Sequence, residues 1–332
     1  MTARFAAQIS VGWSATTAYS TSPAGELPHP CPVPVEGRRL SLSNLGKVLY
    51  PATGFTKGEM LDYYSRIAPV MLPHLRDRPV TFRRFPDGVG GKSFVEKHVP
   101  SHAPEWVTTV RVPSTGTGHG WGGSGYPGEV EYAVVADQPT LIWAANLAVI
   151  EFHVPLWRAG PRRTLPGKPD HLVFDLDPGP GTSIVECCRV ASWIAGRMTG
   201  RDREPLAKAS GSKGLQLYVG LPARTSWDAA RERALRLAQA VAQDHPELVV
   251  TSMKKDLRRG RVLIDWSQNH PAKTTVAVYS LRGTADPSAS APVSWDEVRD
   301  CERGGDPQRL RFTPDQVLDR VQRHGDLFAS LA

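Results

Sequence analysis

The stretch "HLVFDLDPGPG", residues 171–181, constrains the fold most, because an apolar run leads into two carboxylates and then stops at proline and glycine. In an extended strand successive side chains alternate between faces, so Val173, Asp175 and Asp177 share one face. The Cα atoms of the two aspartates would lie roughly 6.5–7 Å apart at ~3.3 Å per residue. The sequence therefore predicts a buried strand that ends in two charges that repel each other.

A divalent cation between the two carboxylates is one way to balance this repulsion. Mg²⁺ and Mn²⁺ take hard oxygen ligands and are usually held by one or two carboxylates together with substrate phosphates. The alternative is a solvated strand end that runs into a turn, since Asp-Pro-Gly is ordinary turn chemistry. An isolated Asp-x-Asp is more often a turn than a metal site, so the rest of the chain has to decide.

A third carboxylate interrupts an apolar strand in "RGRVLIDWSQN", at Asp265. A buried and unpaired carboxylate is costly, so this aspartate needs a partner, either an arginine or a shared cation. Together with Asp175 and Asp177 it forms a set that can hold two metals roughly 3.5–4 Å apart, the arrangement used for in-line displacement at phosphorus. The set is more specific than any one of its members.

A glycine-flexed turn, "SGSKG", lies between these strands. The Ser210 hydroxyl, the Lys213 ammonium and backbone N–H groups are what a triphosphate needs. It is not a Walker A loop, and a simple tight turn is the alternative. Further polar side chains follow in "SQNHPAKTTVAVYSLRG", each able to hold a nucleotide or to be solvated: Gln268, Lys273, Ser280 and Arg282.

Composition limits the class of protein and its compartment. The 332 residues suffice for a sizeable core, and 40 Lys+Arg against 33 Asp+Glu give a net charge of +7, which weakly favours a polyanionic partner. Four cysteines without zinc or disulfide spacing fit a reducing cytoplasm. No apolar run approaches the roughly 18 residues of a membrane span, so no membrane association is expected.

Along the chain we expect a disordered tail over residues 1–37 and a folded unit over 38–332. The folded unit divides into a strand-rich lobe, 38–165, and an α/β catalytic lobe, 166–332. Ser, Thr or Asp precede several apolar periodic runs, and Thr56 and Ser183 each have glutamate three residues later, which predicts capped helices. The predicted class is α/β (α+β), with mixed sheets flanked by helices.

From about Leu40 to Ala329 the sequence resembles the polymerase domain of bacterial DNA ligase D, within the archaeo-eukaryotic primase superfamily that serves non-homologous end joining. The resemblance rests on "LYPATGFTKGEMLDYY", "FVEKHVP", "WAANLAVIEFHVPLW", "VFDLDPG", "SGSKGLQLYV", "VLIDWSQN" and "TTVAVYSLRG", in the family's order. It implies a primase-like catalytic core and a template-dependent nucleotidyltransferase that fills short gaps at DNA ends and accepts ribonucleotides.

The resemblance also implies roles for individual residues. Two catalytic ions, Mn²⁺ or Mg²⁺, would be bound by Asp175, Asp177 and Asp265. The incoming NTP or dNTP would be surrounded by Ser210, Lys213, Gln268 and Arg282, with His153 near its triphosphate and Phe94 under its base. Gln216 and Lys273 join this predicted nucleotide site because of the polar groups they carry in the same stretches of sequence. The 5′-phosphate of a DNA end would be held by Lys47 and Lys57 with Asn44 beside them, and Arg258 would contact the primer or template strand.

One position departs from the family pattern. The second motif normally reads SGxKGxHxY, and this chain has Gln216 in place of the histidine. Glutamine can donate a neutral hydrogen bond but cannot carry a proton or a positive charge to the triphosphate. We therefore expect reduced or specialised activity. Because no ligase or nuclease segment is present in the sequence, we also expect a stand-alone polymerase.

Three other functions stay open at this point. The chain could be a primase-polymerase that starts strands without a primer, a DNA-end-bridging protein with weakened polymerase activity, or a metal-dependent nuclease. The resemblance favours gap filling at DNA ends, with gapped duplex carrying a 5′-phosphate as substrate. It also implies a separate DNA ligase and an end-binding protein as partners, in the bacterial cytoplasm at the nucleoid.

Overall fold

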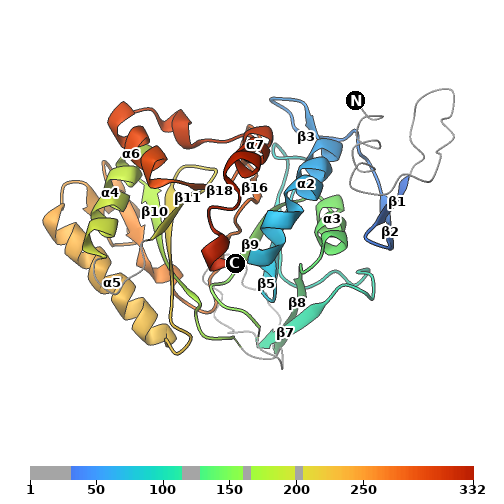
Figure 1. The fold of residues 1–332 in the computed structure, drawn as a ribbon, viewed down its shortest axis with the longest axis horizontal. Helices are drawn as coiled ribbons and strands as arrows, with labels where there is room; N and C mark the ends of the chain where they lie inside the picture. Colours follow the sequence, from blue (N-terminus) through green and yellow to red (C-terminus); the bar gives the residue numbers. More distant parts are fainter. Residues whose placement is uncertain (1–30, 114–127, 160–165, 199–204) are drawn as a thin grey trace.

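A computed structural model describes residues 31–113, 128–159, 166–198 and 205–332 (Figure 1). Two six-stranded sheets dominate these residues, and helices pack on both. The expected α/β class with mixed sheets and flanking helices is therefore confirmed. Residues 1–30 of the predicted tail lie outside the described part of the chain.

The first sheet contains the strand with the paired aspartates at its centre. Its order is β13 (Val249–Val250), β14 (Val262–Asp265), β10 (His171–Pro178), β12 (Leu215–Gly220), β11 (Leu206–Ala209) and β18 (Ala291–Val293). The β13–β14 pair is parallel, whereas the other pairs are antiparallel. Two helices pack against this sheet, α4 (Ile184–Arg197) and α5 (Trp227–Asp244). They cover its apolar face and leave the aspartate face to the rest of the molecule.

The second sheet is built mainly from the N-terminal half. Its order is β15 (Thr275–Val276), β9 (Val149–Val154), β5 (Pro79–Arg84), β8 (Glu129–Val134) and β7 (Thr109–Pro113), with β6 (Phe94–Glu96) also paired to β5. The helices α2 (Lys57–Leu75) and α3 (Gln138–Asn146) pack together beside it. Since β15 returns from the C-terminal half, the two halves share a sheet. The domain division at residue 165 stays a prediction.

Smaller elements complete the chain. Two-stranded pairs are formed by β1 (Cys31–Val35) with β2 (Arg38–Leu42), β3 (Val48–Tyr50) with β4 (Phe55–Thr56), and β16 (Leu281–Arg282) with β17 (Ser288–Ala289). The remaining helices are α6 (Trp295–Gly304), α7 (Pro314–His324) and the short 3₁₀ turns η1 (Lys255–Arg258), η2 (Trp266–Gln268), η3 (Pro307–Leu310) and η4 (Ala329–Leu331).

The start of regular structure is a correction to the sequence prediction. Strand β1 lies inside the segment 1–37, which was expected to be disordered because of its prolines. Pro32 and Pro34 alternate along β1, so both missing N–H groups fall on the edge that faces away from β2. An edge strand tolerates proline at such positions, and the described structure therefore begins with β1 at Cys31.

The predicted helix starts are confirmed. Thr56 and Ser183 cap α2 and α4, and each forms a complete capping box with the glutamate three residues later. Each box satisfies two backbone donors that the first helical turn would otherwise leave unpaired. The start of α2 is thereby fixed beside the β3–β4 pair, and Lys57 is the first residue of this helix.

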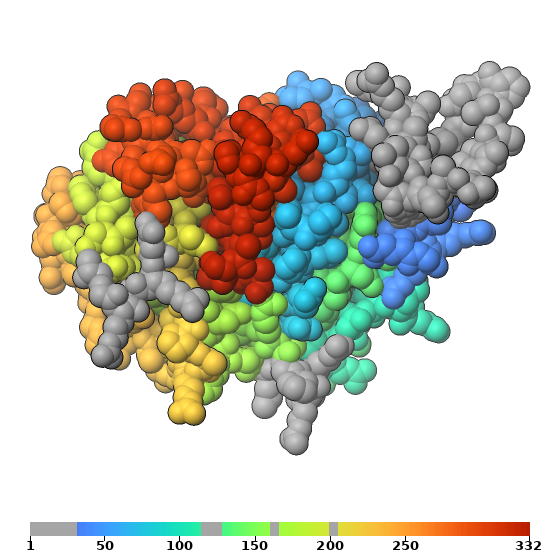
Figure 2. All heavy atoms as spheres, in the orientation of Figure 1, coloured from blue at the N-terminus to red at the C-terminus, as the bar shows by residue number. Residues whose placement is uncertain are grey.

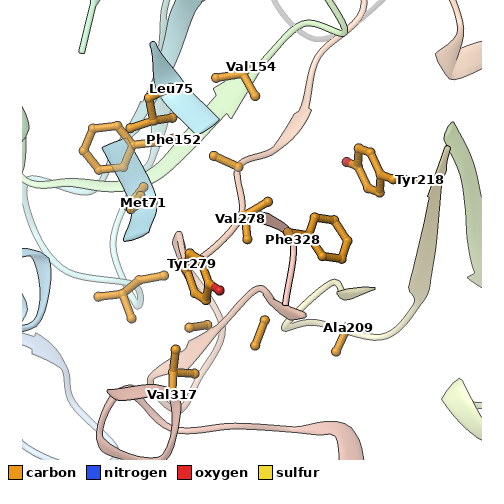
Figure 3. Close-up of a cluster of buried hydrophobic side chains, with 14 of the residues drawn as sticks. Met71, Leu75, Phe152, Val154, Ala209, Tyr218, Val278, Tyr279, Val317 and Phe328 are labelled. Atoms are coloured by element: carbon orange, nitrogen blue, oxygen red, sulfur yellow. The ribbon is translucent and has the colours of Figure 1, made fainter. Parts of the chain in front are cut away.

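The core is continuous across both sheets. Figure 3 shows Met71 and Leu75 of α2 close to Phe152 of β9, with Val278 and Tyr279 between them and the first sheet. The segment after β15 thus fills the space between the sheets. Because these side chains are almost fully buried, their packing joins the two sheets into one apolar core.

The C-terminal segment is anchored by polar contacts as well as by packing. Asp326 accepts hydrogen bonds from the Tyr279 hydroxyl (2.7 Å) and the backbone of Phe328, and it lies 2.8 Å from His74 of α2. Figure 2 shows this segment, drawn in red, on the surface where the two halves meet. In the described ranges no helix is both long enough and apolar enough to cross a membrane.

Candidate active site

Polar side chains form a transverse row across the first sheet. Asp175 on β10 lies opposite Asp265 on β14 and, on its other side, opposite Gln216 on β12. Gln216 is in turn opposite Lys208 on β11. Residues directly opposite each other point to the same face of a sheet. The register therefore places Asp265 beside Asp175, and Gln216 faces the same site.

Asp177 lies one pleat further along β10, where the chain leaves the sheet. The turn after it contacts the loop that carries η1, and the backbone N–H of Gly179 donates to the carbonyl of Arg261 at 2.9 Å. A Cβ on Gly179 would lie 1.8 Å from the carbonyl oxygen of Arg258, so this approach requires glycine. The loop thereby brings the Arg258 charge close enough to stabilise the ionised form of Asp177.

Both aspartates of β10 hold their protons more tightly than an ordinary carboxyl. Burial, and then the charge of Asp177, raise the pKa of Asp175 to about 7, although the Gln216 hydrogen bond opposes this shift. Burial and the charge of Asp265 raise the pKa of Asp177 as well, against the effect of Arg258. The protein thus disfavours two negative charges here, and a bound cation would reverse that preference.

Asp265 has more hydrogen-bond partners than the other two. Its Oδ1 accepts from the backbone N–H and the hydroxyl of Ser267, at 2.9 and 2.5 Å. Its Oδ2 accepts from Gln268 Nε2 at 3.1 Å and lies 3.9 Å from Lys273 Nζ. The structure therefore brings two predicted nucleotide-binding residues, Gln268 and Lys273, directly onto the third predicted metal ligand.

The donor set fits a hard divalent cation, since it consists of carboxylate oxygens on adjacent strands, and the pKa values of Asp175 and Asp177 are raised. Among the residues that the structure describes, no three Asp, Glu, His or Cys side chains are arranged to share one ion. The structure differs from a three-carboxylate metal site because Asp265 is turned toward Ser267, Gln268 and Lys273. For all three aspartates to bind metal, Asp265 has to exchange at least the Gln268 and Lys273 contacts for the cation.

Lys208, which the sequence analysis missed, is fully buried at the end of the row. Its Nζ donates to the carbonyl of Val276 at 2.7 Å and to the hydroxyl of Ser290 at 2.9 Å. Burial lowers its pKa well below the usual value, and the charge of Asp175 opposes that shift. A lysine between two alanines of an apolar strand was the available signal, of the same kind that singled out Asp265.

The glycine-flexed turn before β12 packs against the β16–β17 pair. The Ser210 hydroxyl accepts from the backbone N–H groups of residues 212 and 214, at 3.3 and 3.1 Å, which closes the turn. Gly211 has a φ of +72°, and a Cβ there would lie 2.8 Å from Cγ of Arg282. Lys213 is exposed at the tip of the turn. The turn therefore joins Ser210 and Arg282, two predicted nucleotide-binding residues from distant segments.

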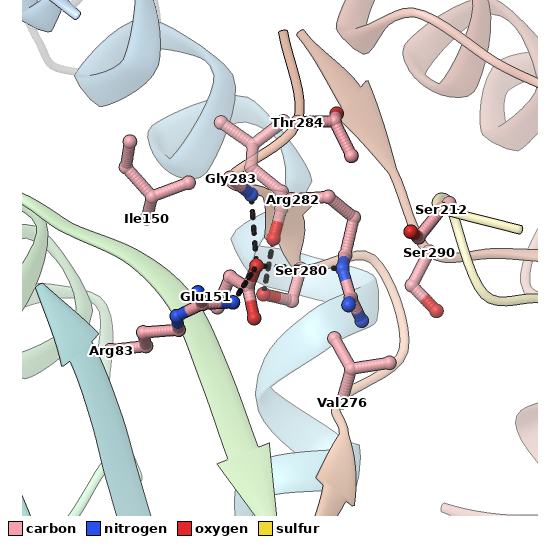
Figure 4. Close-up of polar contacts among 12 residues, drawn as sticks. Arg83, Ile150, Glu151, Ser212, Val276, Ser280, Arg282, Gly283, Thr284 and Ser290 are labelled. Carbon is pink, nitrogen blue, oxygen red and sulfur yellow. Dashed lines mark hydrogen bonds and ion pairs between the residues drawn. The ribbon is translucent and has the colours of Figure 1, made fainter. Parts of the chain in front are cut away.

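A buried carboxylate on β9, Glu151, connects two more of the predicted residues (Figure 4). Its Oε2 lies 2.7 Å from His153 Nε2, and its Oε1 lies 3.6 Å from Arg282 Nε. The same Oε1 accepts from the backbone N–H of Gly283 at 2.9 Å and from Arg83 at 3.2 Å. The sequence analysis did not single out Glu151, although a carboxylate inside "VIEFHV" carries the same cost of burial as Asp265.

Phe94 is an exposed aromatic side chain on β6, with 41% of its surface accessible. The Arg84 guanidinium lies over its ring, 5.1 Å from the centroid, and is itself paired with Glu96 at 3.1 Å. One ring face is thus covered by a cation that is held in place. An exposed ring supported in this way is suited to stacking on a base, as the resemblance implied.

The predicted phosphate-binding lysines lie apart from the aspartates, at the β3–β4 pair. Lys57 is the first residue of α2, is 4% exposed and donates to the carbonyl of Ser43 at 2.6 Å. Lys47 is exposed, pairs with Asp87 at 3.2 Å and donates its backbone N–H to the carbonyl of Asn44. Burial and the nearby Lys47 charge lower the pKa of Lys57 to about 8.

Two ammonium groups and the N-terminus of α2 lie together here, a combination that is suited to an anion. The link to the nucleotide residues is Tyr50, at the end of β3, whose hydroxyl donates to the carbonyl of Arg282 at 2.7 Å. The structure therefore places the three aspartates, Gln216 and His153 on strands of the two sheets, with Ser210, Gln268, Lys273 and Arg282 on the adjoining turns and short elements. It leaves Asn44, Lys47 and Lys57 as a separate neighbouring group, with Arg258 on the loop beyond Asp177.

The comparisons with known proteins agree with this arrangement. The family described as "LigD, primase-polymerase domain" matches residues 56–328. The chain is 44% identical over 293 residues to the multifunctional non-homologous end joining protein LigD of Mycolicibacterium smegmatis, covering 88% of this chain and 36% of that protein. It is 29% identical over 288 residues to the bifunctional LigD of Bacillus subtilis, covering 86% of this chain and 43% of that one.

A solved polymerase domain from Mycobacterium tuberculosis ligase D, in complex with DNA, has the same fold. It superimposes with a TM-score of 0.78 and 39% sequence identity, and the match covers 88% of this chain and 98% of that domain. The chain spans about a third to two fifths of the length of the curated relatives it matches. The expected class, a nucleotidyltransferase of the end-joining polymerases, is confirmed at the level of the family: this chain belongs to the primase-polymerase domains of LigD.

Proposed function

We propose that the chain adds nucleotides to DNA ends under the direction of a template, with two divalent ions held by Asp175, Asp177 and Asp265. The observation that supports this most is the cross-strand row in which Asp175 lies directly beside Asp265, with the pKa of Asp175 raised to about 7. When bound, Mn²⁺ or Mg²⁺ supplies the Lewis acidity that activates a 3′-hydroxyl and neutralises charge on the phosphates.

The side chains around the row would bind and orient the nucleotide. Lys273 and Gln268 now contact Asp265, and would be released toward the nucleotide when that carboxylate turns to a cation. Ser210, Lys213 and Arg282 surround the turn where a triphosphate would lie, and Gln216 would donate from its amide. Phe94 would stack on the base through its exposed ring face.

The DNA contacts belong to the separate lysine group and to the loop beyond Asp177. Lys47 and Lys57 would hold a recessed 5′-phosphate, with Asn44 shaping the turn, because an extra phosphate charge strengthens binding to ammonium groups at a helix N-terminus. Arg258 would contact the primer or template strand. We further propose that the enzyme uses ribonucleotides, works with a separate ligase and an end-binding protein, and acts at the nucleoid in the cytoplasm.

Primer extension on a gapped duplex with a 5′-phosphate tests this function. Each NTP and dNTP is offered with Mg²⁺ or Mn²⁺, and addition of the complementary nucleotide is expected. Asp175→Asn should abolish addition, whereas Asp319→Asn, an exposed aspartate on α7, serves as the matched control and should not. Absence of addition with every nucleotide and both metals contradicts the proposal.

Three further measurements distinguish this function from the alternatives. Products from a single-stranded template without primer would identify a strand-initiating primase. Shortening of the labelled strand without added nucleotides would identify a nuclease, which has no need for the Ser210 turn. Binding of phosphorylated ends without any synthesis would identify a bridging protein that has lost its polymerase activity.

A further inference from the structure

The strongest unassigned feature is the buried carboxylate of Glu151, which no proposed step uses. Only 1% of this residue is exposed, in the middle of the six-residue strand β9. It contacts groups on three segments of the chain: Arg83 on β5, His153 on its own strand, and Arg282 at the end of β16 with Gly283 directly after it. A buried charge with this many partners fixes the positions of those partners relative to one another.

Strand register explains why Glu151 can reach His153 and Arg83 together. Glu151 and His153 are two residues apart, so both point to one face of β9. Their partners on β5 are Arg83 and Thr81 respectively, which gives four polar side chains on one face of the second sheet. The opposite face is apolar, where Phe152 packs edge-on against Tyr64 of α2 at 5.1 Å. The alternation of side chains along β9 and β5 therefore separates a polar face from an apolar one.

The contact with Arg282 leaves its binding end available. Glu151 lies against Nε, at 3.6 Å, and the aliphatic part of Arg282 lies against Gly211. Among the described residues, neither Nη atom of Arg282 is hydrogen bonded. Figure 4 shows this guanidinium between Glu151 and the turn that carries Ser212. A planar fork with free outer nitrogens is the geometry that binds phosphate oxygens in pairs.

The polar face has one more open position. Thr81 is directly opposite His153 and is 5% exposed, yet its Oγ1 has no hydrogen-bond partner among the described residues. Buried hydroxyls are seldom left unpaired, and an unpaired one marks a place that a water or ligand atom completes. Thr81 Oγ1 is thus a polar atom of this face that the described residues do not pair.

We propose that Glu151 is a positioning residue for the triphosphate: it holds Arg282 and His153 in the orientation in which they bind the phosphate chain. This inference rests on the proposed function, because it takes the nucleotide to lie at Arg282 and His153. Glu151 itself does not touch the nucleotide. Its negative charge also balances the positive charges of Arg83 and Arg282, whose side chains are 24% and 16% exposed.

Electrostatics and positioning predict opposite results for Glu151→Gln. Removing a negative charge near a triphosphate would, by charge alone, tighten nucleotide binding and lower KM. If Glu151 positions Arg282 and His153, the same substitution loosens both and raises the nucleotide KM. We expect a rise of about tenfold, equivalent to ~1.4 kcal/mol, with a smaller change in kcat and an unchanged affinity for gapped DNA.

The experiment measures nucleotide KM, kcat and melting temperature for Glu151→Gln, together with direct binding of inorganic tripolyphosphate by calorimetry. Tripolyphosphate binding should weaken to a similar extent, and it does not depend on catalysis. Glu297→Gln is the matched control, because it removes a carboxylate paired with an arginine, Arg320, far from the nucleotide residues. This control should lower the melting temperature without changing KM or tripolyphosphate binding.

A double-mutant cycle with Arg282→Ala shows whether Glu151 acts through Arg282. The effects of the two substitutions on tripolyphosphate binding should be clearly less than additive. An unchanged or lower KM for Glu151→Gln, or additive effects in the cycle, overturns the inference. If Glu151→Gln does not fold, Glu151→Asp retains the charge, withdraws the carboxylate and carries the same expectation. Failure of primer extension by the unmodified chain would refute the proposed function separately, since tripolyphosphate binding would still report on Glu151.

Discussion

The two acidic centres of this molecule lie on the polar faces of its two sheets, and they are built in opposite ways. On β10, Asp175 lies among other carboxylates, and burial with the charge of Asp177 raises its pKa to about 7. On β9, burial alone would raise the pKa of Glu151, yet the hydrogen bond from His153 and the charge of Arg282 lower it to about 2. One centre accumulates like charges, and the other pairs a single charge with several partners.

The difference teaches how to read a buried carboxylate. A buried carboxylate whose charge is balanced by hydrogen bonds and cations of the protein, as at Glu151, stabilises the fold in its ionised form. A cluster of buried carboxylates that the protein leaves without balancing charge destabilises the metal-free protein when it is ionised. Such clusters are typical of sites that bind a cation or carry out chemistry. The following predictions test that contrast, in order of decreasing effect.

The largest effect is expected from the aspartates themselves. Asn at position 175, 177 or 265 should reduce nucleotide addition by at least about 10³-fold, because each change removes a ligand of the catalytic ions. Binding of gapped DNA should remain within about twofold, since the lysine group is untouched. Single-turnover extension and a DNA-binding titration check both statements. Extension at the normal rate by any one variant would remove that residue from the mechanism.

The second effect is on pH. Asp175 with a pKa of about 7 is mostly ionised at pH 8 and mostly protonated at pH 6. Only the ionised form binds metal, so Mn²⁺ affinity should fall about tenfold from pH 8 to pH 6. Glu151 stays ionised over that whole range and adds no pH dependence of its own. Calorimetric Mn²⁺ titrations at both pH values measure the change, and equal affinities would show that Asp175 is already ionised at pH 6.

A third and smaller effect concerns DNA ends. A 5′-phosphate should tighten binding of gapped duplex about fivefold to tenfold at fixed salt, and Lys47→Ala with Lys57→Ala should erase that difference. Because the folded pKa of Lys57 is lowered to about 8, its positive charge is lost as the pH rises through 8, so the preference should weaken by pH 9.

Lys168→Ala, at an exposed lysine elsewhere, is the matched control for the DNA-end measurement. It should leave the phosphate preference intact. Equal affinity of the unmodified protein for phosphorylated and hydroxyl ends would show that Lys47 and Lys57 are ordinary surface charges.

The smallest effect is expected at Gln216. Gln216→His should preserve the fold and leave the rate of addition unchanged or raise it up to about threefold, since the two side chains differ little in bulk. The gain should be in nucleotide KM below neutral pH, where an imidazole carries charge. A large loss of activity at an unchanged melting temperature would show that the site is built around glutamine.

The sequence predicted the parts of this molecule that follow from local periodicity. The alternation in β10 placed Asp175 and Asp177 on one face, and the capping pairs at Thr56 and Ser183 located two helices. The same reasoning failed at β1, because the sequence does not show which edge of a strand will face solvent. Its prolines proved compatible with an edge strand.

The Glu151 centre could not be predicted in the same way. Its partners come from β5, from β9 and from the end of β16 with the residue after it, and Gly283 is more than 130 residues from Glu151 along the chain. Sequence spacing carries no information on such contacts. The available signal was the carboxylate inside the apolar run "VIEFHV", which indicates a buried charge that needs partners but not which partners they are. Likewise, nothing in the sequence showed that Asp265 would be turned toward Gln268 and Lys273.

The contrast between the two acidic centres is tested most directly by thermal unfolding at pH 8, with and without Mn²⁺, of Asp175→Asn and Glu151→Gln. The folded pKa of Asp175 is raised, so its ionised form costs stability at pH 8, and Asp175→Asn should raise the metal-free melting temperature by about 2 °C or more. The folded pKa of Glu151 is lowered, so its ionised form stabilises the fold at pH 8, and Glu151→Gln should lower the metal-free melting temperature. Mn²⁺ should stabilise the unmodified chain and Glu151→Gln but not Asp175→Asn. A metal-free Asp175→Asn that melts lower than the unmodified chain, or one that Mn²⁺ still stabilises fully, would contradict this account.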